Sequence, residues 1–264
     1  MANDRFGVSL ADGLIVEAVA YGGAPTLCLS TQAGCALGCA FCASGRRGLK
    51  RNLTRSELDF QLAAARNRGI APLRLTLSGI GEPLHNPGPV RDFLLAQRAA
   101  GLPVSLTTTG GPLPRLREFL HLPHNGLMLS LHAATPATRG RLLPRAPALD
   151  ELFSLLAVEW GRLSRRQRRR IGFNYLLLGG INDGEAEIAA LTACLRPFPE
   201  ATLHLLACNP VEDSPFASPL PGRIDELQRQ LAGCGLNVRQ ANRWRRRAEG
   251  GCGTLALREE AAVS

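Results

Sequence analysis

The chain has 264 residues, of which 45% are hydrophobic, and no apolar run approaches the roughly 18 residues that a membrane-spanning helix needs. The net charge is +9, the isoelectric point is near 9.7, and Lys50 is the only lysine. Because a guanidinium suits phosphates and stacks on bases, this arginine excess favours a nucleic acid partner, although a genome rich in G and C would also enrich arginine. No leader with a cleavage site opens the sequence, so we expect a soluble, cytoplasmic protein.

The first 25 residues predict a short β-rich lead-in, with apolar residues on both sides of Glu17. Such a lone carboxylate is usually a solvated strand position and only sometimes a catalytic base. From Thr26 onward, short apolar runs alternate with longer helical patterns, which indicates βαβ units and a mostly parallel sheet.

Six such units predict an α/β fold, an open or partial (β/α)6 barrel. The expected strands span residues 26–30, 73–78, 104–108, 126–132, 171–178 and 202–207, and the expected helices lie near 54–68, 89–100, 113–121, 149–161, 184–194 and 224–233. We expect the barrel to occupy residues 26–240 and a C-terminal loop to occupy 241–264. In barrel enzymes, chemistry gathers in the loops that follow the carboxyl ends of the strands.

Three cysteines, Cys35, Cys39 and Cys42, follow the first expected barrel strand as a CxxxCxxC run. Thiolates hold iron–sulfur clusters, and no fourth cysteine follows at ferredoxin spacing, so one iron of a [4Fe–4S] cluster would stay open to another ligand. A zinc site would need a second Cys or His pair, and none follows Cys42 closely. A disulfide framework does not suit a reducing compartment. The run therefore favours a cluster.

The Gly81–Pro83 turn follows the second expected strand. Glycine lets a backbone approach a ligand, and the Glu82 carboxylate can accept hydrogen bonds from a cationic amine; the alternative is a plain Gly-Pro loop. At the ends of later strands, Thr107, Ser130 and Asn209 are small polar residues suited to ribose hydroxyls or an amino acid group. His132 is a weaker candidate, because a histidine at a strand end is commonly just a satisfied polar group.

The remaining motifs are basic clusters and two cysteines. The run from Arg165 to Arg170 precedes a strand, on the rim opposite the chemistry, where a solvated cap is expected. Better candidates for holding a polynucleotide are Arg46, Arg47, Lys50 and Arg51 and, after the last helix, Arg239, Arg243, Arg245, Arg246 and Arg247. Cys252 lies between glycines and is placed as a reachable, reactive thiol. Spacing alone makes Cys28 a buried hydrophobe.

Together these motifs resemble the RlmN/Cfr family, the radical S-adenosylmethionine (SAM) methyltransferases that act on an adenine base of RNA. The cysteine spacing is that of the radical SAM superfamily, whose open iron binds the amino acid end of SAM. The resemblance runs from about Glu17 to Leu255 and is carried by Thr26–Cys35, the cysteine loop, Arg51–Thr54, Gly81–Pro83, Leu129–Ala133, Gly180–Asp183, Asn209-Pro210 and Cys252-Gly253.

The resemblance implies how the site works. The cluster would be bound by Cys35, Cys39 and Cys42, and SAM by Gly81, Glu82, Thr107, Ser130, Leu131, His132 and Asn209. Two SAM molecules would be used per turnover: one methylates Cys252, and the other yields a radical that takes a hydrogen from that methyl group. The methylene radical would add to the adenine carbon, C2 rather than C8. Cys28 would then attack Cys252, forming a transient disulfide, while Glu17 removes the ring proton.

The resemblance also implies rRNA or tRNA as substrate, an electron donor such as flavodoxin or ferredoxin, no membrane, and a monomer. Three departures leave the RNA target open: an N-terminal RNA-binding domain of longer members is absent, Glu17 lies closer to Cys28, and Arg243–Arg247 replaces an acidic segment. Two rival hypotheses are a radical SAM enzyme that modifies a peptide or small molecule, and a non-catalytic iron–sulfur RNA-binding module.

Overall fold

The computed structural model describes residues 2–22, 25–241, 244, 251 and 253–259. One large sheet dominates it, with the strand order β1-β2-β3-β6-β7-β8-β9-β10-β11. The strands are β1 (Asp4–Ser9), β2 (Leu14–Ala20), β3 (Thr26–Leu29), β6 (Arg74–Leu77), β7 (Val104–Thr108), β8 (Gly126–Ser130), β9 (Ile171–Leu177), β10 (Thr202–Ala207) and β11 (Asn237–Gln240). All pairings from β3 to β11 are parallel, whereas β1, β2 and β3 pair antiparallel.

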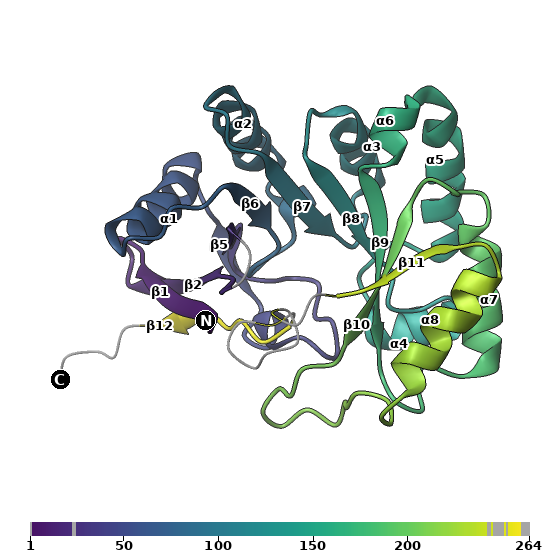
Figure 1. Ribbon diagram of the computed structural model, residues 1–264. Coiled ribbons are helices and arrows are strands. Elements are labelled where there is room, and N and C mark those ends of the chain that lie inside the picture. Colours follow the sequence, from purple (N-terminus) through teal and green to yellow (C-terminus); the bar gives the residue numbers. More distant parts are fainter. Residues whose placement is uncertain (1, 23–24, 242–243, 245–250, 252, 260–264) are drawn as a thin grey trace.

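Helices cover the outer, convex face of this curved sheet, and its concave face looks toward the cysteine loop (Figure 1). The six that follow the expected strands are α1 (Arg55–Asn67), α2 (Pro87–Ala99), α3 (Leu113–His121), α5 (Leu149–Arg162), α7 (Glu185–Leu195) and α8 (Arg223–Gly233). The expected partial (β/α)6 barrel with a β-rich lead-in is confirmed, and the six strands and six helices have nearly the expected ends.

The structure adds elements that the sequence pattern did not predict. They are the hairpin of β4 (Gln32–Gly34) and β5 (Leu49–Asn52), the short helices α4 (Pro136–Leu142) and α6 (Arg165–Arg168), the edge strand β11, and β12 (Arg258–Glu259), which pairs with β2. The 3-10 helices η1 (Ala43–Gly45) and η2 (Pro83–His85) shape two loops of the site. Strand β2 therefore pairs with both the first strand, β1, and the last described strand, β12.

Local sequence explains the main elements. Every residue of β9 is buried, as expected for a parallel strand covered on both faces. Helix α1 begins at a capping box, in which Thr54 and Glu57 bond to each other's backbone N–H groups. No helix in the described part of the chain is long and apolar enough to cross a membrane.

Candidate active site

A cleft of about 830 Å³, open to solvent, lies at the carboxyl ends of β6, β7 and β8. The lining residues are Cys35, Leu37, Cys39, Phe41, Cys42, Ser44, Ser78, Gly79, Gly81, Glu82, Thr107, Thr108, Thr109, Ser130, His132, Leu143, Asn174, Leu176, Leu206 and Gly253. The cleft thus brings together the cysteine loop and three of the predicted strand-end motifs.

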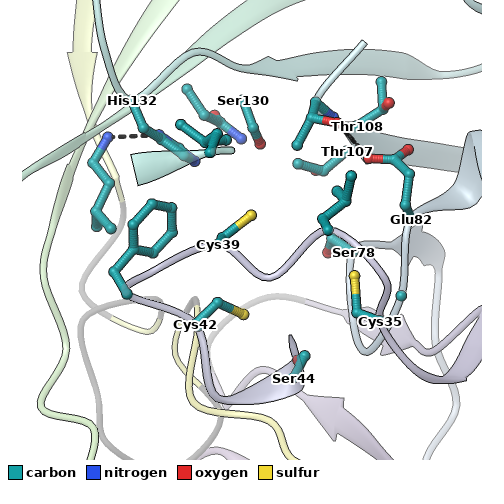
Figure 2. Close-up of a pocket in the computed structure, with 18 of the residues that line it drawn as sticks. Cys35, Cys39, Cys42, Ser44, Ser78, Glu82, Thr107, Thr108, Ser130 and His132 are labelled. Atoms are coloured by element: carbon teal, nitrogen blue, oxygen red, sulfur yellow. Dashed lines mark hydrogen bonds between the residues drawn. The ribbon is translucent and has the colours of Figure 1, made fainter. Parts of the chain in front are cut away.

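The cysteine loop is anchored at its base by two glycines. Gly34 has a φ of +84°, and a Cβ there would stand 2.0 Å from the carbonyl oxygen of Gly48. The same oxygen accepts a hydrogen bond from the N–H of Cys35 at 3.0 Å. Figure 2 shows Cys35, Cys39 and Cys42 arranged around one common space. A side chain at position 34 would break this anchor and displace the first cysteine.

The thiols suit a cluster better than a single metal ion. Burial raises the pKa of Cys35 to about 11, and burial also raises the pKa of Cys39, so these thiols ionise when a cation compensates the charge. Among the described residues, no three Cys, His, Asp or Glu side chains come close enough to hold one ion. A cuboidal cluster places each cysteine on a different iron, so it fits the wider spacing.

Glu82 places a buried carboxylate at the cleft. One oxygen, Oε2, accepts hydrogen bonds from the N–H of Thr109 at 2.8 Å and from its hydroxyl at 3.0 Å, and Oε1 accepts from the N–H of Leu84 at 3.1 Å. Burial raises the pKa of Glu82, and none of the described basic side chains forms an ion pair with it. A cationic amine bound in the cleft would supply the missing positive charge.

His132 is held in a strained, left-handed conformation, with a φ of +55°. Asn182 stabilises it by donating to the carbonyl oxygens of His132 at 2.8 Å and Leu176 at 2.7 Å. His132 Nδ1 accepts from the Leu176 N–H at 2.9 Å, a bond drawn in Figure 2. Burial, helped by Arg139, lowers the pKa of His132 to about 3. The ring is therefore neutral, with its proton on Nε2.

Arg139 is a buried guanidinium that ties the strand-end loops together. Its side chain is almost inaccessible and donates to the carbonyl oxygens of Thr109, Ser130, Leu131 and Pro147. Burial lowers its pKa to about 10, and the nearby Cys39 raises it. No sequence motif indicated this residue, because an arginine on a short helix after a strand has no distinguishing pattern.

Of the two cysteines in the predicted thiol relay, the structure describes only Cys28. Cys28 on β3 is 2% exposed, and its Sγ lies 3.3 Å from the Oγ of Ser78, which lines the cleft. Cys252 lies outside the described residues. Its neighbour Gly253 lines the cleft, and the carbonyl oxygen of Gly253 accepts from the N–H of Ala43 at 2.9 Å. The segment next to Cys252 therefore docks on the cysteine loop.

Glu17 is buried on β2 and is not among the described residues that line the cleft. Its Oε1 forms ion pairs with Arg258 at 2.9 Å and Arg5 at 3.3 Å, and its Oε2 accepts from the N–H of Ala256 at 2.9 Å. The carboxylate expected to act as a base is thus engaged in holding the C-terminal segment.

Two residues predicted to bind SAM, Leu131 and Asn209, are buried but do not appear in the cleft lining. Arg51 forms ion pairs with Asp12 at 2.6 Å and Glu57 at 2.8 Å, so its charge is already matched. Arg239 lies on β11 rather than in a loop after the last helix. The predicted basic residues Arg243, Arg245, Arg246 and Arg247 lie outside the described residues.

The structure also shows cleft residues that the motifs missed. Asn174 is the single amide side chain in the mostly apolar strand β9, a signal that was readable in the sequence. Thr109 and Ser78 lie in two of the expected strand-end loops, and their individual roles depend on the partners Glu82 and Cys28.

Comparisons with known proteins agree with this geometry. The family model for the radical SAM superfamily matches residues 29–192. A probable RNA methyltransferase of Leptothrix cholodnii is 36% identical over 97% of this chain and 73% of its own length. A dual-specificity RNA methyltransferase RlmN of Nitratidesulfovibrio vulgaris is 36% identical over 86% of this chain and 67% of its own length.

Solved structures show the same relationship. A radical SAM methyltransferase from Sphaerobacter thermophilus superposes with a TM-score of 0.84 and 29% identity, over 96% of this chain and 77% of that chain. Streptococcus suis SuiB bound to SAM has a TM-score of 0.63 at 14% identity, over 83% of this chain and 51% of that chain, which is a likeness of fold alone. The chain belongs to the radical SAM superfamily and, within it, to the RlmN-like RNA methyltransferases.

Proposed function

We propose that this protein methylates an adenine ring carbon of rRNA or tRNA, C2 in preference to C8, through a methyl group carried on Cys252. The observation that carries the proposal is the docking of the C-terminal segment. The carbonyl oxygen of Gly253 bonds to the cysteine loop, and the carbonyl oxygen of Leu255 accepts from the hydroxyl of Ser44 at 2.7 Å. Gly253, which follows Cys252 in the sequence, is thus anchored at the edge of the cleft.

The residues present fit a [4Fe–4S] cluster and SAM. Cys35, Cys39 and Cys42 would hold the cluster, and the carboxylate of Glu82 would bind the ammonium group of SAM. Thr107, Ser130 and His132 also line the cleft and offer polar groups to the rest of SAM. When bound, the cluster and SAM supply a radical able to take a hydrogen atom from a methyl group.

Cys28 is assigned to release of the RNA. Its thiolate would attack the Sγ of Cys252, so that a disulfide forms and the bond from Cys252 Sγ to the RNA methylene breaks. The electron pair of that bond goes to the carbon, which takes up a proton and becomes the methyl group. Cys28 does not itself line the cleft, but its Sγ lies 3.3 Å from the Oγ of Ser78, which does, so the thiol would reach Cys252 past this residue.

Glu17 is assigned first to positioning. The family resemblance implies that Glu17 removes the ring proton. In the structure, however, its ion pairs with Arg5 and Arg258 and its hydrogen bond from Ala256 hold the segment that follows Cys252. To act as the base, the carboxylate would have to leave these partners.

The RNA would be held by exposed basic residues on the rim. Arg46 and Arg47 are exposed directly after the cysteine loop. They suit phosphate contacts near the cleft, and the target base would be unpaired or flipped out to reach it.

Two measurements test this proposal. Intact-protein mass spectrometry of cluster-loaded enzyme should show one added methyl group on Cys252, removed by Cys252→Ala. The Cys28→Ala variant should accumulate a covalent enzyme–RNA adduct during turnover, because nothing attacks Cys252 to release it. Methylation by Cys28→Ala at the wild-type rate without an adduct would contradict the relay.

A further inference from the structure

A second cavity lies on the concave face of the sheet, below the rim that carries the cleft. It is open to solvent, spans about 680 Å³ and is lined by Met128, Asn174, His204, Leu206, Arg239, Gln240 and Ala241. It shares Asn174 and Leu206 with the cleft, and its described lining includes none of the three loop cysteines and not Glu82. The two cavities therefore adjoin at Asn174, and a molecule in the second one lies beside the cluster site rather than on it.

Asn174 is the residue in this cavity that most clearly indicates a bound ligand. Its side chain is only 4% exposed, and its amide forms no hydrogen bond with any described residue. By contrast, the amide of Asn182 bonds to three backbone groups around His132. The amide therefore keeps its donor and acceptor available to a molecule in the cavities that Asn174 lines. The Asn174 amide faces both cavities and can bind a molecule placed at their junction.

Asn174 is one of four polar residues that lie in register on neighbouring strands and form a row across the sheet. Ser130 on β8, Asn174 on β9, His204 on β10 and Arg239 on β11 stand opposite one another in successive strand pairs. Residues in register on parallel strands point to the same face of the sheet. The row runs from the cleft to the edge strand, where Arg239 is exposed and has no ion pair with a described residue.

The chemistry of the row matches a nucleotide. Met128 and Leu206 supply an apolar surface for a base, and Asn174 supplies a donor and an acceptor for its edge. The guanidinium of Arg239 suits a phosphate. SAM contains no phosphate, so Arg239 has no partner in a molecule of SAM, whereas every RNA nucleotide carries one.

We propose that the second cavity receives the target adenosine of the RNA, with the Asn174 amide on the Watson–Crick edge of the adenine and Arg239 on its phosphate. The inference rests on the proposed function. The amide oxygen would accept from the N6 amino group, and the amide nitrogen would donate to N1. Since C2 adjoins N1, this edge places C2 at the junction with the cleft, and enzymes that modify a flipped base commonly read that edge.

The test replaces Asn174 with leucine, which has a similar size, and compares RNA dependence with SAM dependence. In Asn174→Leu, kcat/KM for unmodified rRNA or tRNA transcripts should fall roughly 10- to 100-fold, the range for losing one two-bond amide–base contact. SAM affinity and RNA-free formation of 5′-deoxyadenosine should stay at wild-type values in Arg239→Gln, which lies outside the cleft, and should fall much less than the RNA kcat/KM in Asn174→Leu. Asn125→Leu, on an exposed loop at the opposite rim, is the matched control and should change neither.

Two further variants keep the test decisive if Asn174→Leu folds poorly. Asn174→Asp keeps an acceptor but loses the donor to N1, so it should also lose RNA dependence selectively. Arg239→Gln, at an exposed position, should raise KM for RNA and reduce the salt dependence of binding by about one phosphate contact. Unchanged RNA kinetics in the folded Asn174 variants, or a loss of SAM affinity in place of RNA affinity, would overturn the assignment.

Failure of the proposed function is separable from failure of this inference. If the wild-type enzyme methylates no RNA, the probe becomes adenosine 5′-monophosphate, titrated by calorimetry in the presence of saturating SAM. Wild type should bind it more tightly than Asn174→Leu does, and Arg239→Gln should bind it no better than adenosine. Equal binding by all three proteins would refute the nucleotide site whatever the reaction of the enzyme.

Discussion

The carboxylate of Glu17 accepts a hydrogen bond from the backbone N–H of Ala256 at 2.9 Å, across 239 residues of sequence. The same side chain pairs with Arg258, whose strand β12 extends the sheet beside β2. Four residues before Ala256 is Cys252, and between them Gly253 bonds to the cysteine loop. The N-terminal strands and the cysteine loop together fix the path of the segment that follows Cys252 in the sequence.

Replacing Glu17 with alanine should loosen that segment. Removing a charged acceptor costs enough that amide exchange at Ala256 should accelerate roughly 10-fold or more. Hydrogen exchange with mass spectrometry of the peptide covering residues 253–257 measures this directly. Glu17→Gln keeps an acceptor and should accelerate exchange less. Wild-type protection in Glu17→Ala would contradict the holding role.

The anchor of the cysteine loop predicts different outcomes at two neighbouring glycines. Gly34→Ala places a Cβ against the Gly48 carbonyl oxygen, so the loop must shift and most of the bound iron should be lost. Gly48 also has a positive φ, of +66°, but a Cβ there meets nothing within 4 Å. Gly48→Ala should therefore cost only about 1 kcal/mol of stability and retain the cluster. Assays of bound iron and sulfide in the two purified variants measure this difference. Equal iron contents in Gly34→Ala and Gly48→Ala would contradict the anchoring role of Gly34.

The basic rim predicts an RNA-binding defect with a built-in control. Arg46→Glu/Arg47→Glu should weaken RNA binding and lower the salt slope by about one unit per lost phosphate contact. Arg165→Glu/Arg166→Glu makes the same charge change on α6, at the opposite rim. That control should bind RNA far more tightly than the rim variant. Filter binding at several salt concentrations measures both slopes, and equal losses would mean that net charge alone holds the RNA.

Burial of His124 should make the stability of the folded protein sensitive to acid. Its side chain is 2% exposed, its Nδ1 has no partner in the described part of the chain, and burial lowers its pKa from 6.5 to about 4. The folded state resists protonation, so stability is maintained above pH 6.5 and declines as the pH falls toward 4.

His124→Gln removes that titration. The variant should lose about 2 to 3 kcal/mol less than wild type across this pH range, as measured by denaturant unfolding. A remaining acid sensitivity is expected from His132, whose pKa is lowered in the same direction. An identical pH profile in the variant would show that His124 is solvated or paired.

The barrel was predictable because each unit carries its own local signal. The apolar run of β9 and the capping box of α1 depend on neighbouring residues in the sequence. The edge strand β11 was missed because its pattern, Asn-Val-Arg-Gln, is half exposed and too short to read. The two-residue strand β12 exists because β2 is there to pair with it.

In the site, too, the motifs that are contiguous in the sequence were predictable, and the long-range contacts were not. The cysteine run and the Gly81–Pro83 turn are contiguous motifs, and the structure brings them to one cleft. The contacts of Glu17 and Arg139 are set by partners far away in the sequence, so no local pattern could reveal them.

The central claim is methylation of an adenine carbon through a methyl group first placed on Cys252. It is tested most directly by incubating cluster-loaded enzyme with unmodified rRNA and tRNA transcripts, a reductant, and SAM carrying a fully deuterated methyl group, followed by mass spectrometry of the nucleosides. Because one hydrogen is taken from the methyl group and later replaced from solvent, the account predicts 2-methyladenosine that retains two of the three deuterium atoms. Product retaining all three, or cleavage of SAM with no methylated adenosine, would contradict it.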